Sequence, residues 1–406
     1  MSEVPQAAGV SVASLLRPRQ AGVHGKVTNI ELFFDLVFVY AVTQLSHTLL
    51  RDLSVTGAQH VLLLFLAVWW VWIFTGWITN WLDPERLAVR LLLLALMFAG
   101  LLLSTALPAA FAEHGLVFAG AYVFMQVGRS LFMIWALRHS PQAAQRNFYR
   151  ITSWLAASGV LWIAGGLSSD ETRAACWVAA LAIEYLGPAM SFYVPGLGRS
   201  STMEWDVEGG HLAERCSLFV IIALGESVVV TGSSFAESAR NADAWFAFIL
   251  AFVGCVAMWW IYFDLAVERG SRSIRHSTDP GRTARLGYTY LHLLIVAGIV
   301  VSAVGDELSL EHPRAIASGA QAAVLLGGPA LYLLGNALFK QTVNQTNLPF
   351  SHLVGLGLLL LLCWPATTLS ILTLTGSTTL VLALVAAWET LSLRGLRREL
   401  YGAGHD

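Results

Sequence analysis

Long apolar stretches separated by short polar breaks run through almost the whole chain. A bilayer core takes about 20 apolar residues per helix, and a window of that size finds twelve candidate spans. They cover residues 27–50, 58–82, 87–107, 114–137, 148–167, 174–194, 209–233, 243–266, 284–305, 316–339, 350–367 and 374–393. The breaks carry turn residues such as Asp83-Pro84. This pattern predicts an all-α integral membrane protein of about twelve transmembrane helices.

The composition excludes an ordinary soluble enzyme. Of 406 residues, 56% are hydrophobic and 12% are charged, whereas soluble domains average about 25% charged residues. The apolar content also excludes a disordered chain, and the net charge of −2 gives no reason to expect a nucleic-acid partner. The 4 Cys lie in separate apolar runs, so we expect buried thiols rather than disulfides or a metal site. Residues 1–26 contain no apolar core, so no cleavable signal peptide is expected.

The positive charges predict the orientation in the membrane. If the N-terminus lies inside, the cytoplasmic segments hold 18 of the 24 Lys and Arg, including Lys340, and the external segments hold four, at Arg51, Arg173, Arg240 and Arg314. An excess of this kind marks the cytoplasmic side. The expected topology is therefore N-in/C-in, in the cytoplasmic (inner) cell membrane, with the lipid bilayer as the first partner.

The two halves of the chain carry similar segments. Ala99–Ala106 in the third span resembles Ala297–Val304 in the ninth, and Glu184 in the sixth matches Glu389 in the twelfth. These matches predict a parallel 6+6 internal repeat with its pseudo-axis along the membrane normal. The expected parts are a cytoplasmic N-terminal segment (1–26), a first six-helix half (27–194), a cytoplasmic linker (195–208), a second six-helix half (209–393) and a cytoplasmic tail (394–406).

Ionisable residues inside the spans are the candidate functional groups, because each costs about 2.5–3.5 kcal/mol at mid-membrane unless it is neutralised. Depths and shared helix faces predict one cytoplasm-facing polar cluster fed by spans 1, 7, 8 and 9, with a separate, deeper acid in span 7. The predicted catalytic or proton-handling residues are Glu31, Asp35, Glu214, Glu226, Asp264 and His292. The predicted substrate-binding residues are Arg129, Glu184, His211, Arg215, Trp260 and Tyr288.

Some of these groups also suit a metal ion, since carboxylate oxygens and imidazole bind Mg²⁺, Mn²⁺ or iron. The candidate ligands are Glu31, Asp35, His211, Glu214, Asp264 and His292. Each acid or histidine also has a structural interpretation. Glu31 and Asp35 could pair with Arg129 or Arg215, His292 could bond to Tyr288 or a carbonyl group, Asp264 could lie at the headgroup boundary, Glu226 could bond two helices together, and Glu389 could be structural.

Four segments resemble the bacterial low temperature requirement A (LtrA) family. They are Asn29–Ala41, the run from Glu214-Arg215 to Ser227, Trp259–Asp264, and the segment around His292. Cys216 and Ser217 depart from the family pattern, which has an aromatic residue and a glycine there. The resemblance implies a polytopic cytoplasmic-membrane protein. The family name records a cold-growth phenotype and implies no particular reaction.

Three functions fit these features. The first is a secondary transporter coupled to protons or another cation, which would use the carboxylate and histidine cluster to move a small molecule. The second is an intramembrane enzyme acting on a lipid or isoprenoid substrate, acid-catalysed or dependent on a divalent metal, with the same cluster as its active site. The third is a scaffold whose charges hold the helices together. The sequence leaves the substrate and the oligomeric state open.

Overall fold

The chain folds into a bundle of long helices. The computed structural model describes residues 14–18, 26–201, 208–239, 241–264, 280–344 and 347–394. Within these ranges every secondary-structure element is a helix. The β contacts there are isolated bridges, such as that between Leu16 and Leu82. The predicted all-α class is therefore confirmed. Parts of segments 1–26, 195–208 and 394–406, and charges counted for the orientation such as Arg269 and Arg397, lie outside the described residues.

Twelve helical rods in the described residues follow the predicted spans in order. The first six are α1 (Asn29–Arg51), α2 (Val55–Trp81), α3 (Leu87–Ala106) with η1 (Leu107–Ala109), the rod α4–η2–α5 (Gly115–Val123, Phe124–Gly128, Arg129–Ala136), α6 (Gln142–Leu167) and α7 (Asp170–Ala189). The second six are α8 (Gly209–Glu237), α9 (Ala242–Phe263), the rod α11–η4–α12 (Pro280–Ala284, Arg285–Leu291, His292–Glu311), α13 (Gly319–Asn344), α14 (Phe350–Leu362) with η5 (Ala366–Thr368), and α15 (Ile371–Ser392).

Nine of these rods, within the part of the chain that the structure describes, are long and apolar enough to cross a membrane. The other three are α6 and α7, which are long but less apolar, and α14, which is apolar but has only 13 residues. Apolar helices of this number and length require a lipid bilayer around them. The chain is a multi-pass membrane protein.

Polar side chains in the breaks between the spans cap the N-termini of several helices. Ser54 accepts a hydrogen bond from the Gly57 amide (3.0 Å) at the start of α2, and Glu208 accepts one from the His211 amide (2.5 Å) at the start of α8. Side chains of this kind satisfy amides that the first turn leaves without partners. In the α1–α2 turn, hydrogen bonds from the hydroxyl and amide of Ser54 lower the pKa of Asp52.

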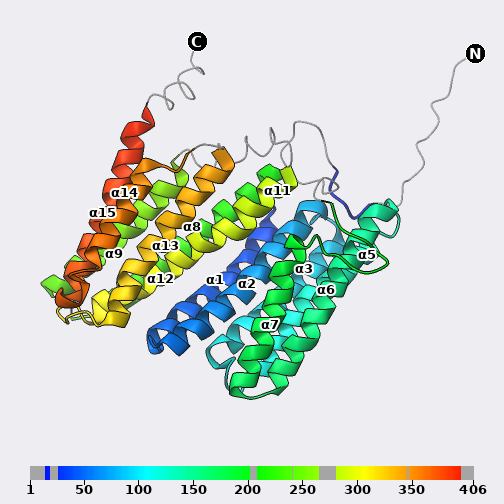
Figure 1. The fold of residues 1–406 in the computed structure, drawn as a ribbon, viewed down its shortest axis with the longest axis horizontal. Helices are drawn as coiled ribbons and strands as arrows, with labels where there is room; N and C mark the ends of the chain where they lie inside the picture. The colour runs from blue at the N-terminus through cyan, green and yellow to red at the C-terminus, as the bar shows by residue number, and fades with distance from the viewer. Residues whose placement is uncertain are drawn as a thin grey trace, which may run out of the picture.

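The helices form two groups that meet at the middle of the bundle. The rods α3 to α7 lie on one side, and α9 and α13 to α15 lie on the other (Figure 1). Between them, α1 and α2 contact α8 and α12. The start of α1 and the end of α15 lie at the same end of the bundle (Figure 1), as an even number of crossings requires. Side chains of both halves can therefore meet at this junction.

Helix contacts in the two halves follow the same order. In the first half α1 packs on α2 and α3, α3 on α4, and α6 on α7; in the second half α8 packs on α9 and α12, α12 on α13, and α14 on α15. The contact between α2 and α7 matches that between α9 and α15. This correspondence agrees with a duplicated six-helix unit, although the duplication and the N-in/C-in orientation stay predictions.

Two rods contain π-helical turns next to candidate site residues. The segment η2 leads directly into Arg129, and η4 leads directly into His292. A π-turn adds a residue to the helix and shifts the faces that follow, and such turns occur often at functional sites. Spacing rules for a regular α-helix therefore fail locally at both positions.

The four cysteines are free thiols. Cys216 and Cys255 are buried, as predicted from their apolar neighbours, and Cys176 is partly buried. The prediction is wrong for Cys363, which is exposed at the end of α14. A position facing the membrane carries the same apolar sequence signal as a buried one, because lipid chains and a protein core are both apolar.

A glycine on α13, Gly328, allows α12 and α13 to pack closely. A Cβ atom on Gly328 would lie 2.6 Å from the Ser302 amide nitrogen of α12, whereas one on the adjacent Gly327 would meet no atom within 4 Å. We expect Gly328→Ala to lower the free energy of unfolding by about 1–3 kcal/mol through overpacking, and Gly327→Ala to raise it by up to about 1 kcal/mol, because alanine favours the helix. Thermal unfolding in detergent measures both, and equal shifts in Tm would contradict the packing argument.

Candidate functional site

Buried charge is concentrated where α1, α2 and α8 meet, near the start of α1. Glu31 and Asp35 on α1 face His211 and Arg215 on α8, and each of the four side chains is at most 1% exposed. Arg17, from the segment before α1, reaches into the same group. We call these five side chains the charge network. It joins a helix of the first half to a helix of the second.

Glu31 is the centre of the charge network. Its Oε1 lies 2.8 Å from Nε2 of His211 and 3.5 Å from Nη1 of Arg215, and its Oε2 lies 2.8 Å from Nη2 of Arg17. Its Oε2 also accepts hydrogen bonds from the amide and the hydroxyl of Thr28, each at 2.9 Å. These bonds between Thr28 and Glu31 cap the N-terminus of α1 and hold the Glu31 carboxylate there.

Asp35 lies one turn further along α1 and forms the second pair. Its Oδ1 accepts hydrogen bonds from Nη2 of Arg215 and from Nε1 of Trp72 (2.8 Å). Arg215 also donates from Nη1 to the Thr79 hydroxyl (3.0 Å), and its guanidinium group lies 5.9 Å from the centre of the Phe34 ring. Two buried atoms, Oδ2 of Asp35 and Nε of Arg215, have no hydrogen-bond partner among the described residues.

The structure adds supporting residues that the sequence analysis did not single out. Arg17 donates from Nε to the Thr79 carbonyl (2.9 Å), which holds it across the end of α2. Asn80 Nδ2 lies 3.3 Å from Nδ1 of His211 and donates to the Glu208 carbonyl (2.8 Å). Hydropathy gives no signal for such residues, because Asn80 lies within an otherwise apolar span and Arg17 lies outside every span.

The predicted cluster from spans 1, 7, 8 and 9 needs correction. Glu214 is exposed on α8, and its Oε2 accepts a hydrogen bond from the Val27 amide (3.2 Å). Asp264 accepts from the Thr390 hydroxyl (3.3 Å), which also accepts from Nε1 of Trp260 (2.7 Å). Trp260 and Asp264 therefore share a face, as predicted, but that face meets α15. The charge network draws instead on spans 1 and 7 and on Arg17, and residues of span 2 form hydrogen bonds to it.

His292 is also separate from the charge network. Its Nε2 lies 2.7 Å from the Tyr262 hydroxyl, and its Nδ1 lies 2.9 Å from the Gly287 carbonyl oxygen. A carbonyl oxygen only accepts, so Nδ1 carries the hydrogen and Nε2 accepts from Tyr262. The imidazole stacks on Tyr288, with 4.9 Å between ring centres. Both nitrogens are thus occupied, as the structural interpretation of this histidine expects.

Glu184 lies in the first half, where four neutral side chains bind its carboxylate. Oε2 accepts from the Tyr122 hydroxyl (2.6 Å) and from Gln126 Nε2 (2.8 Å). Oε1 accepts from the Ser158 hydroxyl (2.7 Å) and from Nε1 of Trp162 (2.9 Å). These four donors, all uncharged, lie on α4, η2 and α6, whereas Glu184 lies on α7. Their hydrogen bonds to its carboxylate therefore hold these four elements together.

Arg129 occupies a separate position beside this group. Its Nη1 donates to the Val71 carbonyl (3.0 Å) and to the Thr75 hydroxyl (2.7 Å), and its Nη2 donates to Oε1 of Gln126. Gln126 thereby lies between Arg129 and Glu184. Of the two cations considered as partners for Glu31 and Asp35, the structure uses Arg215 and places Arg129 elsewhere.

A second set of acids lies deeper in the bundle. Glu226 of α8 accepts a hydrogen bond from the Thr43 hydroxyl of α1 (2.5 Å). Glu307 of α12, just beyond the predicted end of its span, has a buried Oε2 without a partner among the described residues and lies within electrostatic range of His47. We call Glu226 and Glu307 the deep acids. They are carried by α8 and α12, which both contact α1.

Glu389 pairs with a lysine that the sequence analysis assigned to a cytoplasmic segment. The helix α13 continues to Asn344 and buries Lys340, whose Nζ lies 2.8 Å and 2.6 Å from the two carboxylate oxygens of Glu389. Nδ1 of His352 lies 3.8 Å from Oε1 of Glu389. The assignment of Lys340 was wrong because the polar residues at the end of α13 lower the hydropathy without ending the helix.

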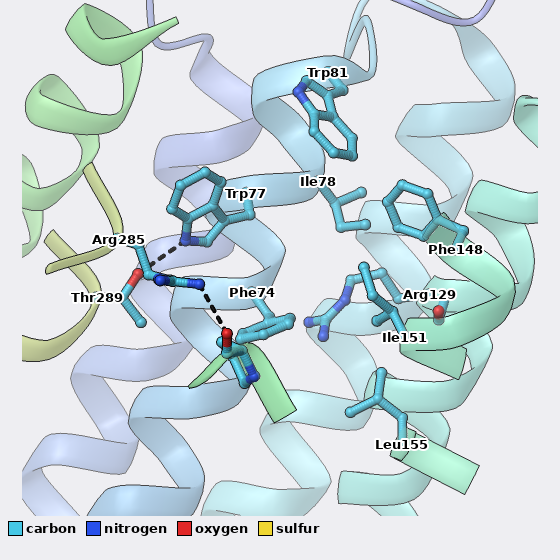
Figure 2. A pocket seen from close by; sticks show the side chains of 12 residues that line it. Phe74, Trp77, Ile78, Trp81, Arg129, Phe148, Ile151, Leu155, Arg285 and Thr289 are labelled. Carbon is cyan, nitrogen blue, oxygen red and sulfur yellow. Dashed lines mark hydrogen bonds between the residues drawn. The ribbon is translucent and has the colours of Figure 1, made fainter. Parts of the chain in front are cut away.

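A narrow cleft lies between α2, α6 and η4. Its walls include apolar and aromatic side chains, and it holds two guanidinium groups, those of Arg129 and Arg285 (Figure 2). Trp77 donates from Nε1 to the Thr289 hydroxyl (3.0 Å), and Arg285 donates from Nη1 to the Pro188 carbonyl (2.9 Å). The cleft therefore combines helices of the first half with η4 of the second half.

The candidate metal ligands do not converge. In the described ranges no three His, Cys, Asp or Glu side chains come close enough to share a metal ion. Glu31 and His211 are adjacent, but the cations of Arg17 and Arg215 touch the same carboxylate and would repel a metal ion at short range. Glu214, Asp264 and His292 lie with other partners, as described above.

Similarity to known proteins extends over most of this chain. Residues 26–387 match the family described as bacterial low temperature requirement A protein (LtrA). An uncharacterized protein of Rhizobium meliloti is 42% identical over 369 residues, which cover 91% of this chain and 90% of that protein. No solved structure matches the chain. The family match spans all twelve helical rods, so this chain belongs to the bacterial low temperature requirement A family.

Proposed function

We propose that this protein is a secondary transporter of the bacterial cell membrane, coupled to protonation of its buried carboxylates. The observation that carries the proposal is the position of the charge network. Glu31 and Asp35 belong to the first half, and their partners His211 and Arg215 belong to the second. In transporters with parallel repeats, the halves rock against each other around a central site. A network across this junction would break and re-form in such a movement.

Incomplete hydrogen bonding in the charge network supports the same function. Buried polar atoms are nearly always paired, and an unpaired one costs about 1–3 kcal/mol. Oδ2 of Asp35 and Nε of Arg215 are both unpaired among the described residues. A site that takes up a proton, a cation or a water molecule during a cycle needs capacity of this kind.

An apolar layer separates the charge network from the deep acids. Between Asp35 and Thr43 on α1 lie Phe38 and Val42, and between Arg215 and Glu226 on α8 lies Phe219, all nearly fully buried. At about 1.5 Å per residue, the layer is about 12–16 Å thick. Protons could then reach the two levels from opposite sides, and passage between them would require the helices to move.

The alternative is an intramembrane enzyme acting on a lipid or isoprenoid substrate. It has less support, because its metal-dependent form needs ligands that converge, and its acid-catalysed form needs a free carboxyl group beside a substrate cavity. Neither the α2–α6–η4 cleft nor the cleft lined by residues of α2 and α7 borders Glu31 or Asp35. The transporter therefore fits the geometry better.

The test is a pH jump on proteoliposomes adsorbed to a solid-supported membrane. The wild-type protein is expected to give a transient current as the half-buried Glu226 carboxyl group beside Thr43 takes up a proton. Glu226→Gln should abolish the transient, because the amide cannot be protonated, while Glu237→Gln, an exposed acid at the end of the same helix, should leave it unchanged. Thermal unfolding confirms that each variant is folded.

A second variant separates protonation from helix packing. Thr43→Val removes the hydrogen bond to Glu226 but keeps the carboxyl group, so the transient current should persist. The proposal is overturned if the wild-type protein gives no pH-dependent current, or if Glu226→Gln behaves like Glu237→Gln.

A further inference from the structure

Two cations in the α2–α6–η4 cleft are held by neutral groups. Arg129 donates to a carbonyl, a hydroxyl and an amide oxygen, and Arg285 donates to the Pro188 carbonyl. No carboxylate in the described residues bonds directly to either guanidinium group, and Gln126 stands between Arg129 and Glu184. Cations inside an apolar bundle are normally paired. The cleft therefore borders two positive charges, of which that of Arg285 is the less buried.

The position of the cleft fits the boundary between the bilayer core and the lipid headgroups. Trp77 and Trp81 line it one turn apart at the end of α2, and Trp side chains collect at both interfaces of membrane proteins. Arg285 lies at the beginning of its rod, and Arg129 lies about 10 Å from the end of α5. In Figure 2, Trp81 lies at one end of the cleft and Leu155 at the other, with both arginines between them.

The size of the cleft limits what it can hold. Its free interior is about 30 Å³, which is room for about two water molecules, so it admits headgroup oxygens but no hydrocarbon chain. Apolar surface for the chains lies next to it, since Leu186 and Met190 on either side of Pro188 are 53% and 50% exposed, and Leu286 beside Arg285 is 39% exposed. A bilayer lipid could place its phosphate against an arginine and its acyl chains on this apolar surface.

We propose that the cleft binds the headgroup phosphate of an anionic phospholipid from the surrounding bilayer. Arg285 is the first contact, and Arg129 contributes charge from deeper in the cleft. The bound lipid would bridge α2, α6 and α7 of the first half to η4 of the second. This site is independent of the carboxylates on which the transporter proposal rests, and it would make the junction of the halves sensitive to lipid composition.

The experiment is native mass spectrometry of the detergent-purified full-length protein, titrated with phosphatidylglycerol or phosphatidylcholine. The wild-type protein should bind phosphatidylglycerol in preference to phosphatidylcholine. Arg285→Gln should weaken phosphatidylglycerol binding about five- to tenfold. The matched control is Arg282→Gln, one turn earlier, which removes the same charge from an exposed position outside the cleft and should bind as the wild type does.

Further arms separate the alternatives. Arg285→Lys keeps the charge without the forked geometry and should restore part of the binding. Inorganic phosphate should give no adduct and no rise in Tm, whereas phosphatidylglycerol should raise Tm in the wild type and not in Arg285→Gln. Equal binding of the two lipids, equal loss in Arg285→Gln and Arg282→Gln, or binding of inorganic phosphate as strong as that of the lipid would each overturn the proposal.

Discussion

Replacing Arg215 with glutamine is expected to lower the free energy of unfolding by about 3–5 kcal/mol. Arg215 is fully buried and contacts both Asp35 and Glu31. Its removal leaves the carboxylates of Asp35 and Glu31 close together in the junction. Arg17, which contacts Glu31, is then the remaining permanently charged cation of the charge network. An uncompensated buried charge is among the costliest single changes in a folded protein. Thermal unfolding in detergent measures the loss.

The matched control for Arg215 is Arg314→Gln. Arg314 is also ion-paired, with Asp243, but its side chain is 85% exposed in the α12–α13 connection. Exposed pairs contribute about 0–1 kcal/mol, so this variant should unfold close to the wild-type temperature. If both variants lost the same stability, the charge network would contribute no more than a surface ion pair, and its assigned role at the junction would be wrong.

The Lys340–Glu389 pair gives the second large effect. Lys340→Met or Glu389→Leu alone should cost about 3–5 kcal/mol, because each removes one member of a buried ion pair. The double variant should cost clearly less than the sum, since two apolar side chains of similar size can replace a buried pair with little loss. The difference between the sum and the double variant is the coupling energy, obtained from a double-mutant cycle on unfolding free energies.

The reference cycle uses Glu85 and Arg90, which form an exposed ion pair between α2 and α3. Their coupling energy should not exceed about 1 kcal/mol. A coupling energy between Lys340 and Glu389 as small as that of the exposed pair would show that the buried pair is screened by water. His352, 3.8 Å from Glu389, remains in every variant of the cycle.

Most of the fold could be predicted from the sequence because the membrane imposes a simple rule. Every backbone polar group in a bilayer must be bonded within its own segment, so an apolar run of sufficient length becomes a helix whatever lies next to it. The twelve predicted spans agree with the observed rods for this reason. The errors occur at ends, as at Lys340 and Glu307, where polar residues continue a helix past the apolar run.

The candidate site was predictable in part. Burial of Glu31, Asp35 and Arg215 followed from the cost of charge in a membrane, which forces such residues into the bundle interior. The pairing did not follow, because twelve helices can be arranged in many ways that all bury the same residues. Arg17 and Asn80 join the charge network through contacts 14 and 131 residues apart in sequence, and no local pattern records such distances.

The sequence by itself determined that this is a multi-pass helical membrane protein of a known family, and it identified part of the buried charge, namely Glu31, Asp35 and Arg215. Both conclusions rest on local properties, namely the length of apolar runs and the energy of single charges in lipid. The tertiary structure decided the rest. It placed Asp264 against α15, His292 between Tyr262 and Gly287, and Glu31 against α8. The partners of a buried residue depend on which helix faces meet. The packing of apolar helices in turn depends on the shape of the whole bundle.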